Sequence, residues 1–90
     1  MQIESPRPRT RARFAEFARR AHGVTQSEAE VLLRVVCGQT DPRAIAASRR
    51  LSAAAVRSRL RSACRRLGAA DLTSAVVRLW PLYRRAKMQL

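Results

Sequence analysis

The sequence predicts a small all-α protein, because apolar residues recur at helical spacing in successive segments and helix-bounding residues separate those segments. Apolar side chains three or four positions apart share one face of a helix, and a globular helix buries that face. Ser, Thr or Asp precedes several of the segments, and Gly23, Gly38 and Gly68 follow three of them. Ninety residues suffice for one domain with a single modest core.

The charge is strongly one-sided and predicts a polyanionic partner. The formal net charge is +13, with 19 basic residues, all but one of them arginine, against six acidic residues. A GC-rich composition bias explains arginine in place of lysine, but it does not explain the scarcity of Asp and Glu. A small domain with such a field attracts nucleic acid, an acidic protein or an anionic membrane surface.

Several classes of protein are disfavoured by what the sequence lacks. Cys37 and Cys64 stand apart with only His22 as a nitrogen ligand, so we expect buried free thiols and no metal site. A single histidine, few carboxylates and no glycine-rich phosphate loop argue against an enzyme, and no cofactor is expected. The apolar runs are too short for a membrane span and no secretory signal is present, so the predicted location is cytoplasmic.

Residues 1–12 are predicted to form a basic flexible arm, and residues 13–90 a single domain. The arm contains two prolines among alternating arginines and shows no periodic apolar pattern. Two interpretations remain open for it. It is either a solvated tail or a basic segment that lies along phosphates or in a minor groove.

A short helix is predicted after the arm, ending at Gly23. Two of the few aromatic residues of the chain lie on its apolar face, so we expect this helix to dock on the main core. The residues of that face are Phe14, Phe17, Ala18 and Ala21.

The next helix is predicted to begin with a capping box and to end at Gly38. In the stretch T-x-x-E, Thr25 caps the helix while Glu28 reaches back to it, and Val24 is placed as a hydrophobic staple. The buried stripe then contains Val31, Leu32, Val35 and Val36.

A third, shorter helix is predicted to start at Thr40 or Asp41, with Pro42 in its first position. Its inward face contains Ile45 and Ala46, with Ala47 as a third candidate. It is short because the next element begins only a few residues later, near Ser52.

The fourth predicted helix covers residues 52–67, with Ser52 as N-cap and Gly68 as C-terminal stop. At 100° per residue, one face contains Val56, Leu60, Ala63 and Leu67. The opposite face centres on Ala54, Ser58, Arg61 and Arg65, flanked by Arg57, Arg59 and Arg66. No acidic residue occurs between Asp41 and Asp71, so this face favours a nucleic-acid partner over simple solvation.

The last predicted helix starts at Asp71 or Thr73, and Pro81 should kink or interrupt it. One apolar face contains Leu72, Ala75, Val76, Leu79 and Tyr83. A second, smaller face contains Val77 and Trp80, about 100° away. That second face is either a self-association surface anchored by Trp80, or a surface half-buried against its own domain.

Three stretches of the sequence, taken in their order along the chain, resemble the LuxR/NarL-type (GerE-like) helix-turn-helix domain of bacterial transcription regulators. They are VTQSEAEVLLRVVCG, IAASRRLS and AVRSRLRSACRRLG, and VRSRL is also similar to sigma-factor region 4. The resemblance implies four helices, the third lying in the major groove and the fourth pairing two subunits. The predicted fold is therefore a four-helix helix-turn-helix domain with an extra short N-terminal helix. The chain departs from the family at Arg49-Arg50, which replaces an apolar residue and a glycine.

The resemblance also implies roles for individual residues of this chain. The positions that match base-facing residues are Arg57, Ser58 and Arg61. The weaker, phosphate-facing candidates are Thr25, Arg43, Ser52 and Arg65. The predicted dimer interface contains Val77 and Trp80.

The predicted function is that of a sequence-specific regulator of transcription, which binds double-stranded DNA as a homodimer and lies on the bacterial nucleoid when bound. The alternative is an adaptor with the same fold that binds RNA polymerase or another regulator. A nonspecific nucleic-acid or RNA-binding protein is disfavoured, because the aromatic residues fall on apolar faces instead of exposed stacking positions.

Overall fold

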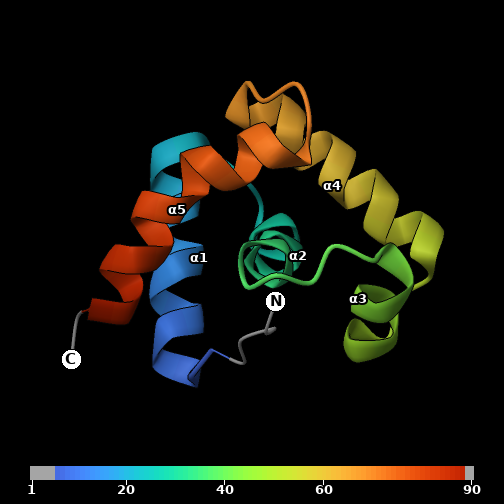
Figure 1. Ribbon diagram of the computed structural model, residues 1–90, viewed down its shortest axis with the longest axis horizontal. Coiled ribbons are helices and arrows are strands. Elements are labelled where there is room, and N and C mark those ends of the chain that lie inside the picture. The colour runs from blue at the N-terminus through green and yellow to red at the C-terminus, as the bar shows by residue number, and fades with distance from the viewer. Residues whose placement is uncertain (1–5, 89–90) are drawn as a thin grey trace.

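The computed structural model describes residues 6–88, which fold into helices without a strand and so confirm the predicted all-α class (Figure 1). Turns of only a few residues connect the helices. The helices of the described residues are α1 (Pro8–His22), α2 (Gln26–Val36), α3 (Pro42–Arg49), α4 (Ala53–Leu67) and α5 (Leu72–Met88).

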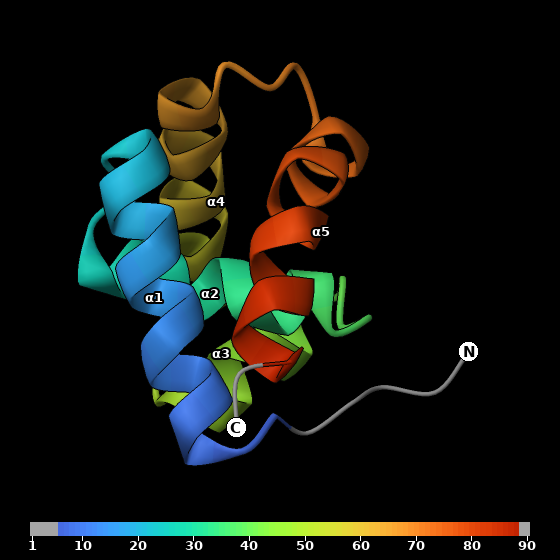
Figure 2. The ribbon, with the colours of Figure 1, turned by 90° about the vertical axis from the view of Figure 1, so that its left-hand side faces the viewer.

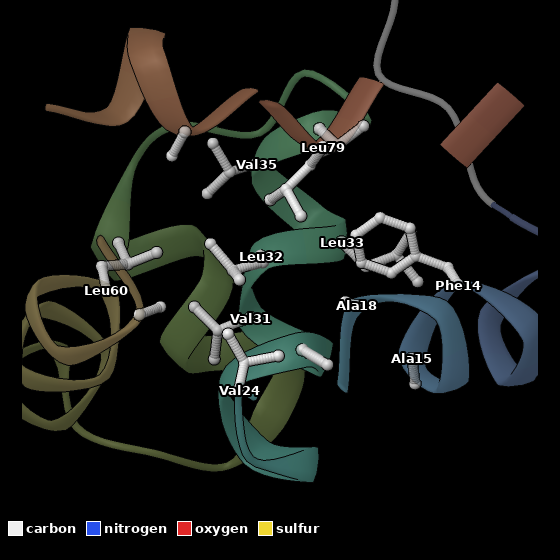
Figure 3. Close-up of a cluster of buried hydrophobic side chains, with 14 of the residues drawn as sticks. Phe14, Ala15, Ala18, Val24, Val31, Leu32, Leu33, Val35, Leu60 and Leu79 are labelled. Atoms are coloured by element: carbon white, nitrogen blue, oxygen red, sulfur yellow. The ribbon is translucent and has the colours of Figure 1, made fainter. Parts of the chain in front are cut away.

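Helix α2 is the centre of the core, with α1 and α5 on one side and α4 on another (Figures 1 and 2). Helix α3 packs against α4, and α1 packs against α5. Figure 3 shows Phe14 and Ala18 of α1 on the Leu33 side of α2, while Leu60 of α4 lies on the other side. The buried α2 residues include the predicted stripe, and they are Glu28, Ala29, Val31, Leu32, Leu33, Val35 and Val36.

The predicted caps start four of the helices. The Thr25 hydroxyl accepts from the Glu28 N–H at 3.1 Å, and the Thr25 N–H donates to the Glu28 carboxylate at 2.8 Å, completing the capping box. Ser52 caps α4 by accepting from the Ala55 N–H. The sequence offered Thr40 or Asp41 as the cap of the third helix, and the structure shows that Asp41 caps α3. It offered Asp71 or Thr73 for the last helix, and Asp71 caps α5.

The predicted flexible arm over 1–12 is too long, because α1 begins at Pro8. Proline fits the first turn of a helix, where its missing N–H has no partner to lose, and arginine is a good helix former. Residues 8–12 therefore extend the first helix instead of forming a tail. The rest of the predicted arm, apart from residues 6 and 7, lies outside the described residues.

Pro81 kinks α5 without ending it. The helix runs from Leu72 to Met88, and its two halves point in different directions (Figures 1 and 2). Tyr83 and Ala86, beyond the proline, are buried, so the second half remains part of the core. The bend lets one helix cover both α4 and α1.

The turn between α3 and α4 closes without glycine. Arg50 adopts a left-handed conformation, with φ of 54°, at the place where the resembling family has glycine. The Leu51 N–H donates to the Ala46 carbonyl at 3.0 Å and satisfies the end of α3. Arg49, which replaces the other family residue, forms an ion pair with Glu30 of α2. This ion pair ties α3 to α2, so the departure Arg49-Arg50 is accommodated.

No helix within residues 6–88 combines the length and the apolar composition needed to cross a bilayer.

Candidate nucleic-acid interface

Helix α4 has one buried and one exposed face, as the sequence predicts. Its buried residues are Val56, Leu60, Ala63 and Leu67. This face packs against α2, α3 and α5, which fixes the direction of every other α4 side chain. The fold therefore fixes the orientation of the opposite face, which is exposed to solvent.

Three arginines follow one another along that exposed face at intervals of four residues. Arg57, Arg61 and Arg65 are all exposed, with Ser58 and Ala54 beside them. Within residues 6–88, none of the three arginines forms an ion pair with a carboxylate. Arg65 donates only to the Ser62 hydroxyl of its own helix, at 3.3 Å. We call Ala54, Arg57, Ser58, Arg61 and Arg65 the α4 arginine face.

Arg66, which the wheel places on the flank of this face, has a structural partner instead. Its Nε lies 2.9 Å from Glu28 Oε1, and the Glu28 side chain is buried. Glu28 therefore serves the cap of α2 and holds the C-terminal end of α4 at the same time. The capping box was visible in the sequence, but the ion pair, 38 positions apart, was not.

Replacing Glu28 with alanine is expected to reduce the free energy of unfolding by about 1–3 kcal/mol, because the cap is lost and the Arg66 pair is broken. Glu28→Gln should cost less, since an amide oxygen still accepts from the Thr25 N–H. Urea titration of both variants measures the difference. Equal losses would show that the ion pair, and not the cap, carries the stabilisation.

Three of the four candidate phosphate-facing residues, Thr25, Arg43 and Ser52, lie at helix N-termini, whereas Arg65 lies in the last turn of α4. Thr25 and Ser52 use their hydroxyl oxygens to cap α2 and α4, which leaves each hydroxyl hydrogen available to donate to a phosphate oxygen. Arg43 is exposed in the first turn of α3. The three residues belong to different elements, since Thr25 caps α2, Arg43 lies in α3 and Ser52 caps α4.

Helix α5 carries an exposed apolar surface. Val77 is 67% exposed and Trp80 44%, and the Trp80 ring also contacts Tyr83 at a centroid distance of 5.7 Å. Trp80 is therefore partly packed against its own domain, and its role in self-association stays a prediction. Pro81 and Met88 are exposed at compatible helical positions, and the sequence reasoning missed Met88. We call Val77, Trp80, Pro81 and Met88 the α5 apolar stripe.

The cysteines have no reactive surroundings. Cys37 is buried, and burial raises the pKa of the half-buried Cys64 thiol, with a smaller contribution from the charge of Asp71. A raised pKa keeps the Cys64 thiol protonated at neutral pH and makes it a poor nucleophile. Across residues 6–88, His, Cys, Asp and Glu do not gather in a group of three that would hold a metal ion.

Two surfaces of the described chain are therefore the candidate functional surfaces, the α4 arginine face and the α5 apolar stripe. Both follow from the chain's own residues, and both lie on helices whose opposite faces are buried. Comparison with protein-family models, with curated protein sequences and with solved structures finds no match.

Proposed function

We propose that the protein is a sequence-specific DNA-binding regulator of transcription, in which α3 and α4 form a helix-turn-helix and α4 enters the major groove. The observation that carries this proposal is the α4 arginine face. Arg49 and Arg66, on the same two helices, are paired with carboxylates and support the fold. Arg57, Arg61 and Arg65 have no such pairing within the described chain and project from a fixed helix. Their charge is free for an external anion.

The dimensions and chemistry of this face suit double-stranded DNA. Arg57 and Arg65 are eight positions apart, which is roughly 12 Å along the helix axis, comparable to the width of the major groove. The small residues Ala54 and Ser58 allow close approach at the N-terminal half of α4, where recognition helices contact base edges. No acidic residue of the sequence lies between Asp41 and Asp71 to repel phosphate.

The contacts divide into two groups. Arg57 and Arg61 offer bidentate donors to guanine, and Ser58 offers a hydroxyl to either edge of a base pair. The phosphate contacts, which position the protein without reading sequence, are assigned to Thr25, Arg43, Ser52 and Arg65.

A selection from random duplex DNA tests the proposal. The purified protein is incubated with the library at about 50 and 200 mM salt, because contacts to phosphate weaken steeply across this range while base discrimination persists. A two-fold-symmetric motif enriched at both salt concentrations supports a dimeric, sequence-specific regulator. Binding that fades at higher salt with no enriched motif would contradict sequence recognition.

The proposed regulator acts as a homodimer through the α5 apolar stripe. Apolar residues at positions 77, 80, 81 and 88 lie on one side of α5, and a two-fold axis through this side would bury both copies of Trp80. A C2 dimer predicts half-sites about one helical turn of DNA apart.

The Val77→Glu variant is expected to raise the dimer dissociation constant more than tenfold, because a carboxylate would have to be desolvated at the interface. The single subunit should remain folded, since Val77 is mostly exposed in one copy. Arg78→Gln, which changes the net charge equally on a neighbouring exposed position, is the control and should leave the dimer intact. Sedimentation velocity over a concentration series measures both. A monomeric parent protein would refute the interface.

The second candidate function is an adaptor that binds RNA polymerase or another regulator, and the α5 apolar stripe favours it. Charge reversals at Arg57 and Arg61 separate the two functions. An adaptor tolerates these reversals with partner binding unchanged, whereas a DNA-binding regulator loses its function.

A further inference from the structure

A groove lies between the first three helices, away from both surfaces described so far. Its floor is apolar, with Ala15, Ala29 and Leu33 all nearly buried and Ala12 at one edge. Its lining residues come from α1, α2 and α3, and they are Arg11, Ala12, Ala15, Gln26, Ala29, Glu30, Leu33, Arg34 and Arg49. We call it the α1–α2–α3 groove.

The groove opens on the side of α2 that faces away from α4. Glu28 points toward α4, because it contacts Arg66 there. At 100° per residue, Glu30 is about 160° and Leu33 about 140° around the helix from Glu28. Figure 1 agrees, since α4 lies above α2 in this view while α1 and α3 flank it on its left and right. A molecule in the groove would therefore leave the α4 arginine face open.

The rim of the groove is cationic, and part of its positive charge is not paired with a carboxylate of residues 6–88. Arg49 is paired with Glu30. Arg11 is exposed and Arg34 is half-buried, and neither forms an ion pair with a carboxylate of residues 6–88. Two arginines on the rim of an apolar floor are suited to a ligand that carries carboxylates next to an apolar side chain.

We propose that the α1–α2–α3 groove binds an acidic, amphipathic segment of a partner protein. An apolar side chain of the segment contacts the exposed Ala12 at the edge of the groove floor, and its carboxylates pair with Arg11 and Arg34. A protein segment fits better than a nucleic-acid backbone, because the floor is apolar and a sugar-phosphate backbone has no apolar side chain to place on it. This proposal stands independently of DNA binding by α4.

Peptide display tests the groove without DNA. Random 15-residue peptides displayed on phage are selected on the purified full-length protein and counter-selected on the Arg34→Glu variant, so that peptides held by general charge are removed. A synthetic copy of the dominant peptide is then titrated into ¹⁵N-labelled protein. We expect acidic, amphipathic peptides to be enriched, and the backbone amides of Ala12, Ala29 and Leu33 to shift on binding.

Matched variants decide between the groove and the net charge. Arg34→Glu and Ala12→Glu should each lower the affinity for the synthetic peptide at least tenfold. Arg78→Glu, on exposed α5 surface outside the groove, changes the net charge as Arg34→Glu does and should leave the peptide affinity within about twofold. Circular dichroism tests whether each variant is folded. If Arg34→Glu is unfolded, Ala12→Glu alone shows whether the peptide binds in the groove.

Three results would overturn the proposal. They are the absence of any enriched peptide, peptide-induced shifts confined to α4 or α5, and equal weakening by Arg78→Glu and Ala12→Glu. Duplex DNA enriched in the separate selection bears on α4 alone. A failure of the groove is thereby distinguishable from a failure of the DNA-binding proposal.

Discussion

The Arg61→Ala variant is expected to bind the selected DNA sequence about 5- to 150-fold more weakly than the parent protein, and to lose its preference at one base pair. A bidentate arginine–guanine contact contributes about 1–3 kcal/mol of discrimination, and each 1.4 kcal/mol is a factor of ten in affinity. Arg61 is exposed at the middle of the α4 arginine face and has no carboxylate partner within the described chain. Removing its guanidinium should therefore weaken DNA binding and leave the fold intact.

Arg65→Ala is the matched control for Arg61→Ala. Arg65 is one turn further along the same face, near the C-terminal end of α4, where contact with phosphate is expected. This variant should lower the affinity for every DNA sequence by a similar factor and reduce the salt dependence of binding by about one phosphate contact. Fluorescence anisotropy with the selected duplex and with single-base variants of it measures both effects. If the two variants lose affinity equally on every duplex, the assignment of Arg61 to base reading is wrong.

Features with a local signal could be predicted from the sequence. The capping box of Thr25 and Glu28 involves residues three positions apart, and the buried side of α4 follows from a four-residue apolar spacing. A helix's own periodicity sets both, so neither requires knowledge of the neighbouring elements. The α4 arginine face was predictable for the same reason, because the exposed face is the complement of the buried one.

Features that depend on distant elements were not predictable. The pairs Glu28–Arg66 and Glu30–Arg49 join residues 38 and 19 positions apart, and only the packed fold brings them together. The sequence placed Arg66 beside the α4 arginine face, whereas its ion pair with Glu28 gives it a structural role. The α1–α2–α3 groove likewise requires three elements in their final positions.

The start of α1 was missed for a different reason. Two prolines at positions 6 and 8 are typical of an extended arm, but only the second lies in the helix, in its first turn, where proline is tolerated. The helix gains its stability from packing further along, at Phe14, Ala15 and Ala18. Tertiary contacts of this kind override the local signal of a proline-rich and arginine-rich beginning.

Phe14→Ala is expected to have the largest effect on stability, a loss of about 3–5 kcal/mol in the free energy of unfolding. The Phe14 side chain is fully buried and meets Tyr83 of α5 edge to face, with ring centroids 6.2 Å apart. Alanine there would leave a cavity among α1, α2 and α5, which the surrounding backbone can fill only partly. Domains of this size are stable by only about 5–15 kcal/mol, so the variant should lose a large part of its total stability.

Phe17→Ala, one turn later on α1, is the control. Phe17 is only partly buried at the edge of the core, where Arg85 lies over its ring at 5.0 Å, so its replacement should cost less than half as much as that of Phe14. Urea titration followed by circular dichroism measures both variants. A clear difference would show that α1 completes the core through Phe14. Equal, small losses would instead identify α1 as an appendage to a core formed by the four following helices.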